Sequence, residues 1–155
     1  MMSRVKAFSL VEILIVVVIL GILAAVAVPK FASASQDAMT SATQSTVAGV
    51  RSAIATYRTS AVIQGNDPYP SLSQLSDGSV IKFDLPPNPF TSVGGVQAVS
   101  EAQANARGVS NEASIGWNYF VDNAANPPVA IFYSNTATES TAADGSGGTL
   151  GANEL

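Results

Sequence analysis

The chain has 155 residues and a net charge of −4, and it contains neither cysteine nor histidine. A chain of this length forms one domain with a core of modest size. Without cysteine it holds no disulfide or thiolate metal site, and without histidine it lacks the commonest general base, so no catalytic site and no enzyme are predicted. Lysine and arginine are scattered along an acidic sequence, so no nucleic-acid partner is predicted either.

Basic residues precede a long apolar run at the start of the chain. Residues 1–7 form a short polar segment whose charges are Arg4 and Lys6, and residues 8–28 carry a single charge, Glu12. As a helix this run is about 32 Å long, close to the ~30 Å hydrocarbon core of a bilayer. Positive charge before the span favours a cytoplasmic N-terminus. We therefore expect a single membrane-spanning helix in that orientation.

Two ordinary interpretations of this run are a secretory signal and an uncleaved signal anchor. A secretory signal has a shorter apolar region followed by a cleavage site, which here would fall in residues 24–27. A plain anchor fits the hydropathy but not Glu12, because an acid at the centre of a membrane helix costs on the order of 2.5–3.5 kcal/mol. The simplest explanation of Glu12 is a position near the headgroups, or stabilisation of the helix N-terminus through the helix dipole.

The N-terminal string as a whole gives a more specific interpretation. The string KAFSLVE, from Lys6 to Glu12, followed by ILIVVVILGILAAVAVPKF, closely resembles the N-terminus of type IV prepilins and of type II secretion pseudopilins. The resemblance implies that a prepilin peptidase cuts between Ala7 and Phe8 and methylates the new amine of Phe8. Ala7 departs from the family, which mostly has glycine before the cut, but it keeps a small residue there.

Three further positions match the same family. Ser9 stands where the family usually has threonine or serine, and Gly21 and Pro29 stand where it often has a glycine and a proline that weaken the helix. Proline lacks an N–H and its ring crowds the preceding turn, so we expect Pro29 to kink the helix rather than end it. Residues 21–29 are therefore the expected site of a kink or of local unwinding.

The resemblance implies a homo-oligomeric helical filament whose core is built from the apolar helices. In such a core Glu12 is a buried anion, and the Phe8 amine of a neighbouring subunit is the available cation. At ~4 Å and an effective dielectric of ~20, this pair attracts by about 4 kcal/mol before desolvation is subtracted. Because desolvation offsets most of that attraction, we expect the pair to set register more than stability.

The function implied is that of a structural subunit of a type IV pilus or pilus-like filament. Before assembly, the subunit would span the inner membrane once, among lipids, and its partners would be the prepilin peptidase and the inner-membrane assembly platform. It would then enter an extracellular pilus or a periplasmic pseudopilus. The alternatives are a type II secretion major pseudopilin and an uncleaved, signal-anchored envelope binding protein. The choice between adhesion, motility, DNA uptake and protein secretion stays open.

Helical periodicity continues beyond the apolar run, through residues 30–64. Apolar residues recur at spacings of three and four, which predicts one buried face. The turn-forming run Gly65–Pro68 should end the helix between Ala61 and Gly65. The fold predicted is α+β, a ladle in which a long N-terminal helix packs on a small antiparallel sheet. The predicted buried face contains Val47, Val50, Ile54, Tyr57 and Ala61.

Residues 65–135 should form the globular loop and sheet region. A short turn is expected near Leu72–Leu75, the proline-rich run Leu85–Phe90 should be a loop, and Asn126–Pro128 should join the last two strands. Residues 136–155 have no apolar periodicity, which predicts a flexible or loosely docked tail. The expected strands are Val80–Phe83, Val93–Val99, Ser114–Val121 and Val129–Tyr133, with Trp117, Tyr119 and Phe132 in the core.

Three acidic residues toward the C-terminus are the candidates for a metal site. Some major pseudopilins hold calcium in their C-terminal loops, so the resemblance makes Asp122, Glu139 and Asp144 weak calcium candidates. The sequence around them lacks the regular alternation of oxygen ligands and the final glutamate of an EF-hand. The simpler interpretation is that they are solvated acids, and no cofactor is predicted.

Overall fold

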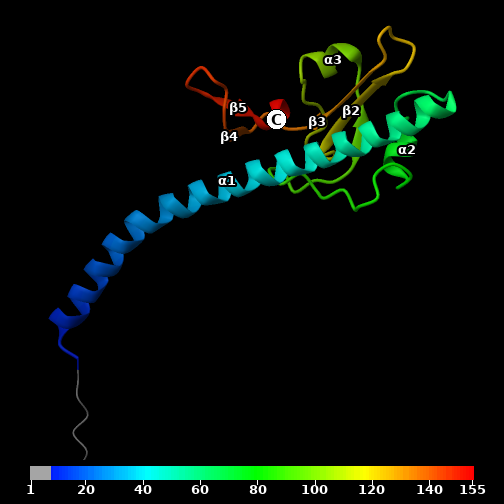
Figure 1. Ribbon diagram of the computed structural model, residues 1–155. Helices are drawn as coiled ribbons and strands as arrows, with labels where there is room; N and C mark the ends of the chain where they lie inside the picture. Colours follow the sequence, from blue (N-terminus) through cyan, green and yellow to red (C-terminus); the bar gives the residue numbers. More distant parts are fainter. Residues whose placement is uncertain (1–7) are drawn as a thin grey trace, which may run out of the picture. The chain divides into compact units, whose positions relative to one another are not determined.

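The computed structural model describes residues 8–155, and the expected leader, residues 1–7, lies outside them. The chain divides into two units, the first ending at Gln36 and the second spanning Asp37–Leu155. Helix α1, Leu10–Gln64, begins in the first unit and ends in the second (Figure 1). Among the described residues, all strands and the shorter helices lie in the second unit. The α+β class is therefore confirmed.

The first unit buries almost nothing. Every described residue up to Gln36 is exposed except the half-buried Ala27. The helix continues through Pro29, and the Ser33 hydroxyl donates a hydrogen bond to the Pro29 carbonyl at 3.1 Å. Most helices in proteins are stabilised by packing one face on a core. This part of α1 has no such partner within the unit.

In the second unit, α1 packs through the face that its periodicity predicts. Val47, Val50 and Ile54 are buried and Tyr57 is half-buried against the same core. The helix ends in a Schellman motif: the Asn66 N–H donates to the Ala61 carbonyl at 2.9 Å and the Gly65 N–H to the Val62 carbonyl at 3.2 Å. Gly65 has φ +72°, a left-handed conformation that glycine adopts without steric cost.

The main sheet has three strands: β1 (Val96–Ala98), β2 (Trp117–Asp122) and β3 (Val129–Ser134). Its order is β1-β2-β3, with β2 and β3 antiparallel and β1 parallel to β2. The sheet is therefore mixed, where an antiparallel sheet was expected. The connection from β1 to β2 contains helix α3 (Glu101–Asn105), and a long connection of this kind permits parallel pairing.

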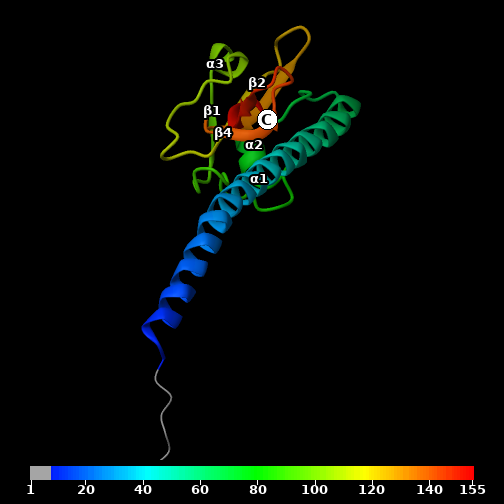
Figure 2. The same ribbon diagram turned by 90° about the vertical axis from the view of Figure 1, so that its left-hand side faces the viewer.

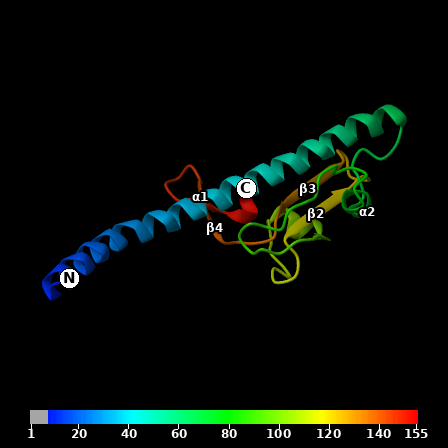
Figure 3. The ribbon, with the colours of Figure 1, turned by 90° about the horizontal axis from the view of Figure 1, so that it is seen from below.

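The core lies between this sheet and the distal half of α1 (Figure 3). Trp117, Tyr119 and Phe132 are all buried, as expected. The rings of Trp117 and Phe132 stack with their centroids 5.6 Å apart. The Tyr119 hydroxyl donates to the Pro70 carbonyl at 2.8 Å, so the buried phenol has its hydrogen bond.

The segment between α1 and the sheet contains a short helix, α2 (Leu72–Ser76), where a turn was expected. Its capping box pairs the Ser71 hydroxyl with the Gln74 N–H and the Gln74 side chain with the Ser71 N–H. The expected strand Val80–Phe83 is wrong. Val80 and Ile81 are both buried, and consecutive burial breaks the alternation that a half-buried strand requires.

The C-terminal segment is not the flexible tail that its composition predicts. Residues 136–155 contain a two-stranded sheet, β4 (Glu139–Ala143) and β5 (Thr149–Gly151), and the 3-10 turn η1 (Ala152–Glu154) next to β3 (Figure 2). Hydrogen bonds hold it: the Thr141 N–H donates to the Thr40 hydroxyl at 3.0 Å and the Ser140 hydroxyl to the Leu150 carbonyl at 2.8 Å. Small side chains allow the C-terminal segment to pack closely against α1. They leave no apolar periodicity, and the prediction of a tail relied on that lack.

Candidate functional site

The most unusual surface of the chain is the apolar part of α1. Its large apolar side chains are about half exposed or more, with Leu10 at 82%, and Phe8 just before the helix reaches 77%. Mean hydropathy reaches 3.1 in this helix, which by length and composition is able to cross a membrane. An apolar surface of this extent marks contact with lipid or protein. The exposed large side chains of its core stretch are Val11, Ile13, Leu14, Ile15, Val16, Val17, Val18, Ile19, Leu20, Ile22, Leu23, Val26 and Val28.

The first turn of α1 is organised by a serine and a glutamate. The Ser9 N–H donates to Glu12 Oε2 at 3.3 Å, and the Ser9 carbonyl accepts from the Glu12 N–H at 3.1 Å. The Ser-x-x-Glu spacing is that of a capping box, in which the glutamate satisfies the N–H of the capping residue. The sequence analysis noted Ser9 as a family position but missed its capping contact with Glu12, which this spacing predicts.

Glu12 is also the one charge between Phe8 and Val28. Its position in the first turn places a negative charge beside the positive end of the helix dipole. It lies four residues, about one helical turn, after Phe8. Ala7, the other half of the expected cleavage site, lies outside the described residues. The start of α1 therefore presents an acid and an aromatic residue at the edge of an apolar surface.

Gly21 and Pro29 both lie inside α1, as the sequence places them. A Cβ added at Gly21 meets no atom within 4 Å, so no neighbour within the subunit requires glycine there. Pro29 has no N–H for the carbonyl of Ala25, one turn earlier, and this leaves a gap in the helical hydrogen bonds. The helix α1 is continuous, but its helical structure is locally less stable at these two positions.

Comparison with known proteins finds a match at the N-terminus. Residues 2–28 match the family model described as the prokaryotic N-terminal methylation motif. The chain also resembles a pilus protein. It is 48% identical over 52 residues to the type IV narrow pilus major component PilA5 of Thermus thermophilus. That match covers 34% of this chain and 45% of the relative, so the similarity spans less than half of either protein. No solved structure matches the chain.

The matched segment contains most of the N-terminal residues singled out from the sequence. Residues 2–28 include Ala7, Phe8, Glu12 and Gly21, and Pro29 follows directly after the matched region. The capping contact between Ser9 and Glu12 belongs to the same segment. The globular part of the second unit is not covered by the motif, so the candidate site is the N-terminal helix.

The three calcium candidates are not gathered into a site. Asp122 accepts from the N–H groups of Ala124 and Ala125, and Asp144 from those of Ser146 and Gly148. The Ser146 bonds, backbone and hydroxyl together, lower the pKa of Asp144. Each of these two carboxylates therefore accepts hydrogen bonds from the backbone of its own turn. Within residues 8–155, no three acidic side chains come close enough together to hold a metal ion.

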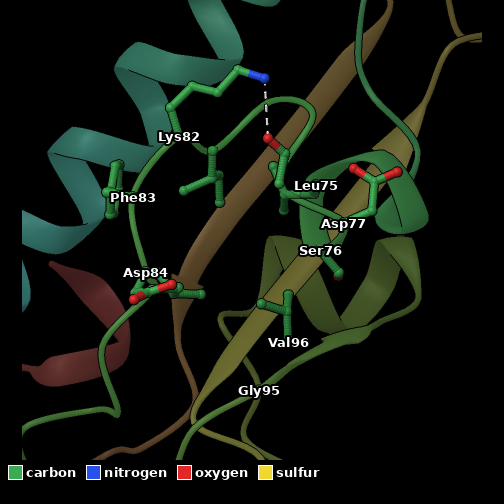
Figure 4. Close-up of a pocket in the computed structure, with 11 residues that line it drawn as sticks. Leu75, Ser76, Asp77, Lys82, Phe83, Asp84, Gly95 and Val96 are labelled. Atoms are coloured by element: carbon green, nitrogen blue, oxygen red, sulfur yellow. Dashed lines mark hydrogen bonds between the residues drawn. The ribbon is translucent and has the colours of Figure 1, made fainter.

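A cavity of about 610 Å³ lies between α2 and the chain preceding β1 (Figure 4). Two of its charged residues have local partners. The Lys82 ammonium donates to the Gly78 carbonyl at 3.1 Å, and the Asp77 carboxylate accepts from the Ser79 N–H at 2.7 Å. Hydrogen bonding by the Ser79 side chain, and then by its backbone, lowers the pKa of Asp77. Neither arrangement pairs a nucleophile with a base.

Proposed function

We propose that the chain is a structural subunit of a type IV pilus or pilus-like filament. One observation carries the proposal: the apolar part of α1 exposes all its large side chains and has one acid, Glu12, in its first turn. Before assembly, lipid would cover this helix in a single-pass inner-membrane precursor with a cytoplasmic N-terminus. After assembly, the same helices of other subunits would cover it in the filament core. The similar Thermus thermophilus protein is a pilus major component, which favours a pilus over a secretion pseudopilus.

Processing prepares the helix for this change of surroundings. Cleavage between Ala7 and Phe8 removes Arg4 and Lys6, the charges that hold the N-terminus in the cytoplasm. It also creates an α-amine, a group whose pKa is ordinarily about 7.7–8.0, and methylation keeps its positive charge. The mature helix thus begins with one cation at Phe8 and one anion at Glu12.

These two charges explain how subunits take register in an apolar core. A buried carboxylate without a partner costs several kcal/mol, whereas a paired one comes near to neutral. The Phe8 amine of a neighbouring subunit supplies the partner. Subunits out of register would bury both charges unpaired. The contact between Glu12 and the Ser9 N–H occupies one carboxylate oxygen, which leaves the other available for the amine.

Gly21 and Pro29 give the helix a place to adapt when subunits pack. Glycine and proline lower helix stability by about 0.8–1.0 and 3 kcal/mol relative to alanine. The helix can bend or unwind there without breaking the buried face that anchors it from Val47 onward. The proposed role of residues 21–29 is therefore local adjustment during assembly.

The identity of the mature N-terminus tests this function most simply. The chain would be isolated from membranes and from sheared surface filaments, and its N-terminal peptide sequenced by mass spectrometry. The proposal requires N-methylated Phe8 as the first residue and the presence of the chain in the filament fraction. A first residue of Met1 or Met2 in the membrane fraction, with no chain in the filaments, would establish an uncleaved anchor instead.

A further inference from the structure

The second unit contains a cavity lined by three arginines. It has a volume of about 380 Å³ and lies between the distal half of α1 and strand β3. Arg51 and Arg58 come from α1, and Arg107 comes from the residues that follow α3. The whole sequence has seven basic residues, so nearly half of them meet at this one cavity. Among the described residues that line it, none is acidic.

Each guanidinium is held in place by neighbouring groups of the second unit. The Arg51 side chain donates through Nη2 to the main-chain oxygens of Phe132 and Leu155, at 3.3 and 3.2 Å. Arg58 lies over the ring of Tyr69, 5.0 Å from its centre, and Arg107 lies 5.2 Å from the centre of the Tyr133 ring. Cation–π contacts of this kind hold the side chains without neutralising them.

Two observations describe the surroundings of the positive charge at this cavity. Nη1 of Arg107 is buried and has no hydrogen-bond partner among the described residues, a costly arrangement for a charged donor. Burial, and then the charge of Arg107, lower the pKa of Arg51. Like charges held close together with a free donor are stabilised by an anion that enters between them.

We propose that this cavity binds the phosphate group of a small phosphomonoester. Arginine forks match the oxygens of phosphate in a bidentate geometry. Phosphate carries about −1.5 to −2 charges near pH 7, which balances three arginines better than one carboxylate does. The remaining walls include Ile54, Ala130 and Ile131, so an apolar substituent has a surface to contact. The net charge of −4 opposes a long polyanion, which favours a small ligand over a nucleic acid.

The test uses the full chain in a neutral maltoside detergent and isothermal titration calorimetry at constant ionic strength. The probes are phenyl phosphate, inorganic phosphate and benzoate. We expect phenyl phosphate to bind most tightly, inorganic phosphate more weakly and benzoate least. If benzoate binds as tightly as phenyl phosphate, the site is a carboxylate site and the proposal is wrong. Equal affinity for the two phosphates would contradict the role given to the apolar walls.

Variants show whether the binding belongs to this cavity. Arg107→Gln and Arg58→Gln should each weaken phenyl phosphate binding by about tenfold or more, because each removes charge-assisted hydrogen bonds. Arg58 is exposed, so its replacement leaves the core intact. Lys82→Gln removes the same charge outside the cavity and should leave the affinity unchanged. An equal loss for Lys82→Gln, or no binding of any probe to the native chain, would overturn the proposal. The cavity lies wholly in the second unit, so its test is independent of filament assembly.

Discussion

The carboxylate of Glu12 accepts a hydrogen bond from the Ser9 N–H, three residues earlier, at 3.3 Å. This contact gives Glu12 a role within the subunit, as the cap of the first turn of α1. The pairing proposed for the filament gives it a second role, as the counter-charge of a neighbouring Phe8 amine. Glutamine also occupies this capping-box position, but it carries no charge. The two roles are therefore separable by substitution.

The first prediction concerns processing. Ala7→Leu should block cleavage, because a peptidase site that accepts alanine or glycine has little room beyond Cα. The precursor should then remain in the membrane with its leader, visible by intact mass as an uncleaved N-terminus. Ala7→Gly restores the usual residue of the family and should be processed at least as fast as the native chain. Maturation of the leucine variant at the native rate would place the cleavage site elsewhere.

The second prediction concerns the weak stretch of α1. Replacing Gly21 and Pro29 together by alanine should stabilise the helix by about 4 kcal/mol in propensity, from the separate values of about 1 and 3. Membrane insertion should be unchanged, whereas the yield of sheared filament should fall because the helix no longer adapts. The ratio of filament to membrane-held subunit is the measurement. A native filament map with an unbroken straight helix through residues 21–29 would contradict this account.

The third prediction concerns the end of α1. Gly65 has φ +72°, so Gly65→Ala should destabilise the second unit by about 1–2 kcal/mol, the cost of a left-handed residue with a Cβ. Fluorescence of Trp117, the chain's one tryptophan, reports unfolding of that unit. Gly94→Ala is the matched control, because a Cβ there meets nothing within 4 Å and its φ is not left-handed. Equal stability of the two variants would mean that the Schellman motif contributes little.

The fourth prediction concerns alkaline pH. Burial raises the pKa of Tyr119, and nearby Tyr57 and Tyr69 raise it further, so the folded state favours the neutral phenol. The associated stability is fully present below the unfolded pKa of about 10 and is lost as pH rises above it. The free energy of unfolding should therefore fall above about pH 10.

Tyr119→Phe identifies the group responsible for that fall. It removes the hydrogen bond to the Pro70 carbonyl and should cost about 1 kcal/mol at neutral pH. Above about pH 10 its stability should fall less steeply than that of the native chain, because the phenylalanine does not ionise. Some slope should remain, because burial also raises the pKa of Tyr133. An unchanged slope would show that another group dominates.

Periodicity and local turn chemistry predicted much of this fold. Helical and strand spacing identify buried positions directly. For this reason the sequence predicted the buried helix face from Val47 to Ala61 and the core residue Trp117. The C-terminal hairpin was missed because its stability comes from hydrogen bonds such as that from Thr141 to Thr40, which leave no apolar pattern. Parallel pairing of β1 was missed because register between distant segments is not local information.

The two candidate sites also differ in how far the sequence alone predicts them. The N-terminal methylation motif is contiguous, so Phe8 and Glu12 could be proposed as site residues without a structure. The arginine cavity could not, because Arg107 lies far along the chain from its partners. Arg51 and Arg58 are seven residues apart, two turns of one helix, and that spacing was the one available signal. Their convergence with Arg107 depends on how the loop after α3 folds.

The central claim is that the charge of Glu12 directs assembly, and Glu12→Gln tests it most directly. The substitution keeps the capping position and should leave membrane insertion equal or better, since the insertion penalty falls. Ser9→Ala, which alters the capping residue and keeps the acid, is the matched control. The measurement is the ratio of sheared filament to membrane-held subunit. The account predicts a large drop for Glu12→Gln and little change for Ser9→Ala, because only the first leaves a neighbouring amine buried without its counter-charge. An unchanged ratio for Glu12→Gln would mean that Glu12 is a helix cap alone.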